Sequence, residues 1–307
     1  MRFSQLFTIR SGAWILAFIT PSLALVVLIS ILTGGISSSR SFLVEANTTG
    51  MSVQFSGLNN AWPLGRATIC APLDRPKREN ARGTGPCDER RYTPSENDDL
   101  LLEFPDGSSA TVLVQGNGGL AIQVSGMSLF GDNTRILVAR DDWIAVGAMV
   151  FSGQAVIGGQ MGSGQQNILL DGRFEVRETS SFSLGGRNRI EVIKSGTLLR
   201  GEQASISESG ADTTVTGHIT WSDNRRSMDV VIVSLPGNTA LSLGHIGGDQ
   251  VSSIQPDWID YALASPTLVA LTLVLSICIG AGQLFFTATS YLRKTNRTSE
   301  TTTTEGQ

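Results

Sequence analysis

Cys70 and Cys87 are the residues of this chain whose chemistry is easiest to anticipate. They flank the segment APLDRPKRENARGTGP, in which Leu73 is the one sizeable apolar residue. A cysteine pair outside the cytoplasm is typically oxidised, and closing a loop of this length stabilises a fold by roughly 3 kcal/mol. A metal site is the alternative, but two cysteines without nearby histidines are poor zinc ligands. The sequence therefore predicts a Cys70–Cys87 disulfide and no metal.

The segment 70–99 is the most polar part of the chain between its two ends, and it predicts a long loop. Its basic residues form a candidate docking loop for anionic headgroups or an acidic partner surface. These residues are Arg75, Lys77, Arg78 and Arg82. The alternative is a solvated surface insertion, because acidic residues at 96, 98 and 99 offset the basic charge.

Residues that could carry out catalysis are scarce. The two histidines, His218 and His245, have no Cys, Asp or Glu at metal-ligand spacing. No GxSxG, HExxH or Walker A motif occurs. The glycine-rich segment GQMGSGQQ at 159–166 has no lysine after it, so it predicts a turn. We therefore expect a protein that is not an enzyme and has no cofactor.

Two long uncharged segments must position whatever lies between them. Residues 13–33 and 266–286 each hold 21 residues without a charge, enough to cross the roughly 30 Å hydrocarbon core as a helix. A cleaved signal peptide is the alternative for the first segment, since basic residues precede it and small residues follow it. The sequence predicts two transmembrane α-helices.

The charges that flank these segments predict their orientation. Basic residues precede the first segment at 2 and 10 and follow the second at 293, 294 and 297, whereas Asp257 and Asp260 precede the second. By the positive-inside rule, we expect residues 1–12 and the polar tail 287–307, whose composition predicts disorder, to be cytoplasmic, and 37–264 to lie outside the cytoplasm. Trp258 and Tyr261 are expected at the membrane interface.

The segment 37–264 has the pattern of a mainly β domain. Glycine is abundant, at 34 residues, and short runs such as RFEVRET (173–179) and RIEVIK (189–194) alternate apolar with polar residues. Turn signals such as PDG and GNGG separate these runs. We predict a β-sandwich or jelly roll, with an irregular β-helix as the alternative. Asn47 begins an N-T-T sequon in this domain.

These features favour a membrane-anchored scaffold or accessory protein whose outer β domain binds another envelope or membrane component. In shape alone the architecture resembles membrane-anchored periplasmic jelly-roll proteins that pass lipid along an apolar trough. That resemblance implies the alternative, a carrier of lipid or of another hydrophobic ligand. A net charge of −4 gives no reason to expect nucleic acid. The expected partners are the bilayer and an envelope protein, and the expected location is a bacterial inner membrane with the β domain in the periplasm.

Overall fold

The computed structural model describes residues 40–57, 60–75, 87–162, 165–180, 189–208, 211–223, 226–245 and 251–256, with single positions between 260 and 287. The chain divides into two units, Met1–Gln255 and Pro256–Gln307. The first unit contains the strands and the candidate site, and we describe it by itself.

The first unit is built mainly of strands. The N-terminal strands are β1 (Arg40–Thr48), β2 (Gly50–Phe55), β3 (Ala61–Pro72), β4 (Tyr92–Glu103), β5 (Ser109–Val114), β6 (Leu120–Ser125) and β7 (Thr134–Val138). Helix α2 (Arg140–Val146) follows. The remaining strands are β8 (Met149–Ile157), β9 (Gln160–Gly162), β10 (Gln165–Asn167), β11 (Leu169–Ser180), β12 (Arg189–Leu198), β13 (Glu202–Glu208), β14 (Ala211–Asp212), β15 (Val215–Ser222), β16 (Ser227–Ser234), β17 (Thr239–His245) and β18 (Val251–Ile254).

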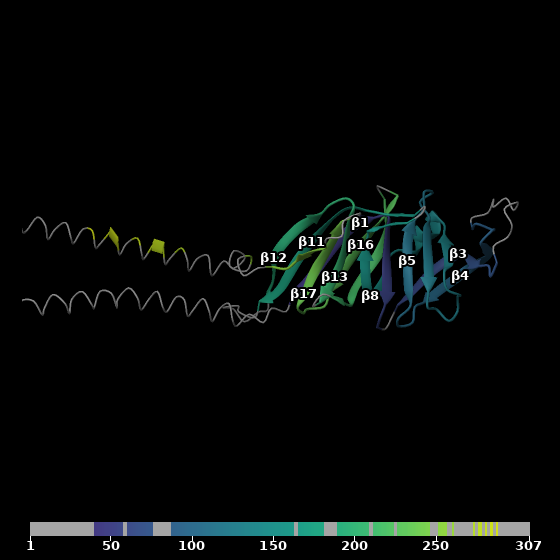
Figure 1. The fold of residues 1–307 in the computed structure, drawn as a ribbon, viewed down its shortest axis with the longest axis horizontal. Coiled ribbons are helices and arrows are strands. Elements are labelled where there is room, and N and C mark those ends of the chain that lie inside the picture. The colour runs from purple at the N-terminus through teal and green to yellow at the C-terminus, as the bar shows by residue number, and fades with distance from the viewer. Residues whose placement is uncertain are drawn as a thin grey trace, which may run out of the picture. The chain divides into compact units, whose positions relative to one another are not determined.

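Sixteen of the described strands form one sheet, in the order β12-β11-β1-β16-β15-β8-β2-β5-β6-β7-β3-β4, with β13, β14, β17 and β18 attached as a branch. Figure 1 shows these strands side by side, with β12 near one end of the unit and β3 and β4 near the other. The pairings between the described strands are antiparallel, such as Phe42↔Val176 between β1 and β11. This corrects the alternative prediction of an irregular β-helix, whose coils stack through parallel strands.

The sheet branches at β8. Residues 153–157 of β8 pair with β2 along one edge. Along the other edge, residues 149–153 pair with β15, and Val156 and Ile157 pair with β13. The branch creates a long arm (β15, β16, β1, β11 and β12) and a short arm (β13, β17 and β18). The β domain is thus one branched sheet.

Beyond β2 the sheet curls back, so that the start of β3 lies against β8. The indole N–H of Trp62 donates to the carbonyl of Val150 at 2.7 Å. The backbone N–H of Ser152 donates to Oδ1 of Asn60 at 2.7 Å. Both side chains bond to the backbone of β8, and this fixes the place from which the β3–β4 hairpin extends.

One continuous core joins both arms to the curled part of the sheet. Alternate residues of the strands supply it, among them Phe42 and Val44 of β1 and Ala204 and Ile206 of β13. At the curled end Phe55 stacks on Phe104 with ring centroids 3.9 Å apart. Burial of such side chains is worth roughly 1.5–3 kcal/mol each, so this core is the main support for the fold.

The alternation of apolar residues predicted most strands but failed at one long run. The apolar run WIAVGAMVF (143–151) predicts a strand, yet its first part lies in α2 and β8 begins only at Met149. Trp143 is fully buried on the helix, and Gly147, with φ of 75°, ends it. A buried tryptophan followed by exposed residues is compatible with a single helical turn as well as with a strand.

In the described part of the chain, no helix is both long and apolar enough to cross a bilayer. The first predicted span, 13–33, lies outside the described residues, as do positions 1–12. Within the second, 266–286, the described positions 273, 276, 277, 280, 283 and 284 are helical.

Candidate docking site at the β3–β4 hairpin

The hairpin of β3 and β4 is built on two strands of twelve residues each. Its register runs from Ala61↔Glu103 at the base to Pro72↔Tyr92 at the tip, with bulges on either side of Gly65. Gly65 has a φ of 63°, which a residue with a side chain rarely adopts. The segment that connects β3 to β4 is 73–91, which is shorter than the loop predicted over 70–99.

The predicted disulfide between Cys70 and Cys87 is confirmed, with Cα atoms 5.8 Å apart. Both cysteines are buried in a small apolar cluster with Leu113, Ala121 and Leu137, separate from the main core. These three residues belong to β5, β6 and β7, so the side chains packed around the disulfide join the tip side of the hairpin to neighbouring strands. The cross-link ties the returning chain at Cys87 to the part of β3 that pairs with β7.

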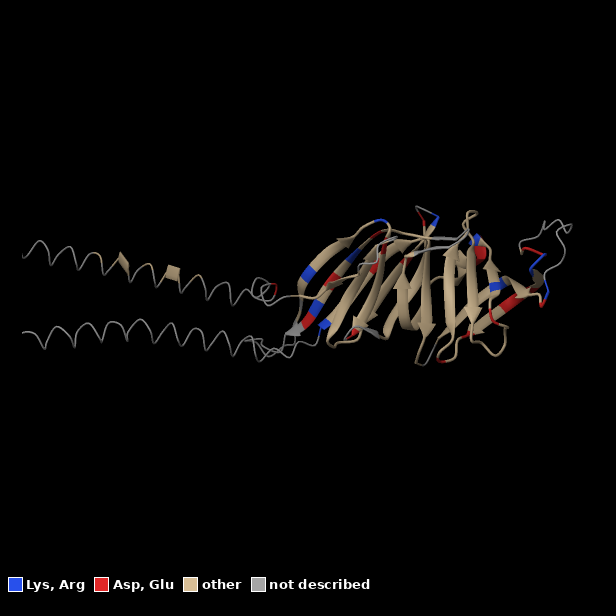
Figure 2. Cartoon of the chain, viewed as in Figure 1, with Lys and Arg blue, Asp and Glu red and all other residues tan. Residues whose placement is uncertain are grey.

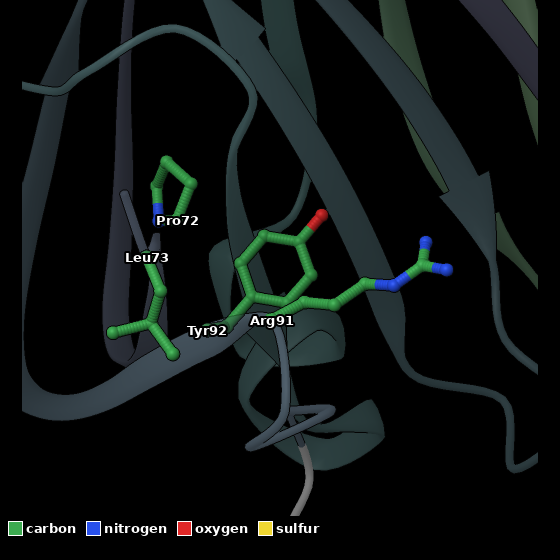
Figure 3. Close-up of a pocket in the computed structure, with 4 residues that line it drawn as sticks. All are labelled: Pro72, Leu73, Arg91 and Tyr92. Carbon is green, nitrogen blue, oxygen red and sulfur yellow. The ribbon is translucent and has the colours of Figure 1, made fainter. Parts of the chain in front are cut away.

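A tight turn returns the chain from Cys87 into β4. The backbone N–H groups of Arg91 and Tyr92 both donate to the carbonyl of Asp88, at 2.8 and 2.9 Å. The N–H of Leu73 donates to the carbonyl of Arg91 at 2.8 Å and closes the end of the hairpin. Pro72, Leu73, Arg91 and Tyr92 line a pocket of about 320 Å³. Arg91 contributes a cationic side chain to the lining of the pocket. Figure 3 shows its guanidinium pointing away from Leu73 and Pro72.

The outer strand of the hairpin is acidic and open to solvent on both faces. Residues 93–99 of β4 are all exposed, and they include Glu96, Asp98 and Asp99. Among the described strands β4 pairs with β3 alone, so its outer backbone edge is available for another strand. The ion pair of Arg66 with Asp98, at 3.5 Å, is highly exposed and worth at most about 1 kcal/mol.

Charged residues gather at two regions of the β unit and are sparse in the strands between them. Strands β2, β5, β6 and β8 contain no charged residue. Figure 2 shows the resulting uncoloured middle, with charges on the long arm at one end and on the hairpin at the other. The hairpin is thus electrostatically distinct from the strands that support it.

The structure tests only part of the predicted docking loop. Arg75 is exposed on the connection after β3. The remaining residues of that prediction, Lys77, Arg78 and Arg82, lie outside the described residues, as do the interface aromatics Trp258 and Tyr261. The acidic edge of β4 was not predicted, because TPSENDD (93–99), a run of seven polar or proline residues, is typical of a loop. The only available signal was the return to apolar residues at 100–102.

The structure gives neither histidine a catalytic or metal-binding neighbourhood. His218 lies on β15 opposite Val150 and Val231, which are apolar. His245 is exposed at the end of β17, opposite Glu202. Within the described residues, no group of three or more His, Cys, Asp or Glu side chains converges on a possible metal position.

Comparison of the chain with protein-family models, with curated proteins and with solved structures gives no match. Function must therefore be inferred from the residues of the hairpin and from the way the β unit begins and ends.

Proposed function

We propose that the chain is a membrane-anchored scaffold or accessory protein whose β domain binds another envelope protein through the β3–β4 hairpin. The observation that carries this proposal is the form of the hairpin: a disulfide-linked pair of strands whose outer strand is acidic and exposed. A free edge recognises an extended segment by main-chain hydrogen bonds, and side chains then select the partner. The acidic residues of β4 favour a basic partner segment.

With two helices at 13–33 and 266–286 as anchors, the chain must enter and leave the β domain on the same side. Backbone pairing near the two ends of the β unit supports this arrangement. The N–H of Arg40, where β1 starts, donates to the carbonyl of Gly237 at 3.2 Å. Strand β17 begins two residues later, and its Leu241 pairs with Ile254 near the end of β18. The first and last strands of the unit are thus joined through one short segment, residues 237–241.

The alternative, a lipid carrier, has less support from the described residues. An apolar ligand needs an open trough between strands. The space that such a trough would occupy is filled by large side chains, such as Trp62, Phe55 and Phe151, which are at most 1% exposed. The packed core therefore favours the scaffold.

A pull-down of the full chain in mild detergent, with protein and lipid identification, tests the proposal. The variant Glu96→Gln/Asp98→Asn/Asp99→Asn removes the acidic charge from the β4 edge and should reduce recovery of the partner at least tenfold. The matched control is Asp141→Asn/Asp142→Asn on α2, where Asp141 is exposed and Asp142 is half-buried. This control should recover the partner normally.

Two results would contradict the proposal. One is a partner that both variants retain equally, since the binding would then not involve the hairpin. The other is recovery of bound lipid without any protein, which would favour the carrier.

A further inference from the structure

Several exposed aliphatic side chains gather around the start of β1. Ile190 and Val192 of β12 are 67% and 50% exposed, and Val233 and Leu235 are 37% and 63% exposed. We call these four residues the apolar rim. Large aliphatic side chains that gather on an exposed surface indicate contact with a membrane or a protein.

The sheet register brings the rim to the point where the chain enters the β unit. In β11, Arg177 pairs with Val192 of β12 and with Ser41 of β1. Because neighbouring strands lie about 4.8 Å apart, Val192 is roughly 10 Å from Ser41.

On the other side of β1, the rim continues along the end of β16. Val233 pairs with Leu43. Leu235 lies between Val233 and Gly237, whose backbone pairs with Arg40. The rim therefore flanks the first residues of β1 on both sides.

The length of chain before β1 limits how far the rim can be from the bilayer. The segment proposed to cross the membrane ends at Thr33, seven Cα steps before Arg40. Seven fully extended steps reach at most about 25 Å. Headgroups occupy about 5–7 Å of that distance on each side of the hydrocarbon core. The entry of the chain therefore keeps this end of the sheet near the headgroups.

We infer that the apolar rim rests on the outer surface of the bilayer, with Ile190, Val192 and Leu235 inserted among the lipid headgroups. This inference rests on the proposed membrane anchoring. Contact at the rim would orient the β domain on the membrane, with the β3–β4 hairpin at the other end of the sheet directed away from it. The ion pair of Arg177 and Glu175, 2.8 Å apart on the same region of sheet, has no net charge and suits a neutral lipid surface.

Lipid-quenching of site-specific fluorophores in the full chain tests this inference. Single cysteines are introduced as Val192→Cys and Leu235→Cys in a Cys278→Ala background, and each is labelled with a nitrobenzoxadiazole dye without reduction of the disulfide. The labelled chains are reconstituted in phosphatidylcholine vesicles that contain a lipid with a headgroup nitroxide. Leu129→Cys is the control, because Leu129 is 73% exposed on the connection between β6 and β7.

We expect the dyes at 192 and 235 to be quenched at least threefold more than the dye at 129. Equal quenching at all three positions in chains that float with the vesicles would overturn the rim contact and leave the anchoring intact. Dyes at 192 and 235 that are shielded from water but not quenched would also overturn it, because a second protein copy would then cover the rim. Chains that do not float with the vesicles would overturn the anchoring and the rim contact together.

Discussion

Gly217, on β15, lies at a position where the structure leaves no room for a side chain. A Cβ atom there would lie 2.4 Å from the carbonyl oxygen of Val231 and 2.7 Å from Cζ of Phe151. The carbonyl belongs to the neighbouring strand β16 and cannot move without disturbing the ladder between the two strands. The long arm therefore depends on glycine at this position.

We expect Gly217→Ala to lower the free energy of unfolding by about 1–3 kcal/mol, the usual cost of overpacking. Thermal unfolding of the full chain in detergent, followed by circular dichroism, measures the change. Gly116→Ala is the control, because nothing lies within 4 Å of a Cβ at that position. Equal midpoints for the two variants would show that β16 yields to the added methyl group.

Asn47 begins a glycosylation sequon, but in the fold its side chain has a structural role. Its N-T-T sequon predicts a glycan acceptor on a surface, but the residue is only 9% exposed. Its amide nitrogen donates to Oγ of Ser222 at 3.0 Å and to Oδ1 of Asp229 at 2.6 Å. Both amide hydrogens are used in holding β1 to β15 and β16, so Asn47 in the folded domain is a structural residue.

At the scale of the element, the disulfide is the main covalent constraint on the β3–β4 hairpin. We expect Cys70→Ser/Cys87→Ser to lower the free energy of unfolding by about 3 kcal/mol, because the unfolded chain regains the freedom of a loop closed over 17 residues. Chemical denaturation of the full chain in detergent measures this loss. Arg66→Gln, which removes only the exposed ion pair of the same hairpin, should cost at most about 1 kcal/mol. A double serine variant no less stable than Arg66→Gln would contradict the prediction.

The sequence predicted those elements whose own residues alternate and missed those that depend on a neighbour. The segment LAIQVS predicts a strand with the observed bounds of β6 (Leu120–Ser125), because its apolar residues and flanking turns are local. Strand β3 was not, since Pro63 and Gly65 interrupt its pattern, and its structure depends on pairing with β4. The exposed part of β4 has no buried face and is a strand only because β3 lies beside it.

The candidate site was predicted in part for the same reason. The disulfide follows from two cysteines and a polar segment, which are local signals. The acidic free edge follows from the order of strands in the sheet, which places β4 last. Neither the order of the strands nor the branch at β8 can be predicted from the alternation of apolar and polar residues.

For the whole molecule, the proposed topology makes a prediction about the two termini. Protease added to right-side-out spheroplasts should degrade the β domain and leave epitope tags at both ends intact, because in the proposed topology the flanking basic residues hold both ends in the cytoplasm. Western blotting against each tag, before and after membrane permeabilisation, measures this. A mature chain that lacks the N-terminal tag would instead support signal-peptide cleavage.

The pairing of β1 also determines how long this strand stays unpaired during synthesis. Arg40 pairs with Glu178 of β11, 138 residues further along, and the next partner strand, β16, begins only at Ser227. At 5–20 residues per second, β1 waits roughly 7–28 s for its first partner. During that time RSFLVEANT is an unpaired apolar segment, open to wrong partners. Among the described strands β1 thus waits longest for a partner, and in the proposed topology a chaperone on the outer side of the membrane would act most usefully on it.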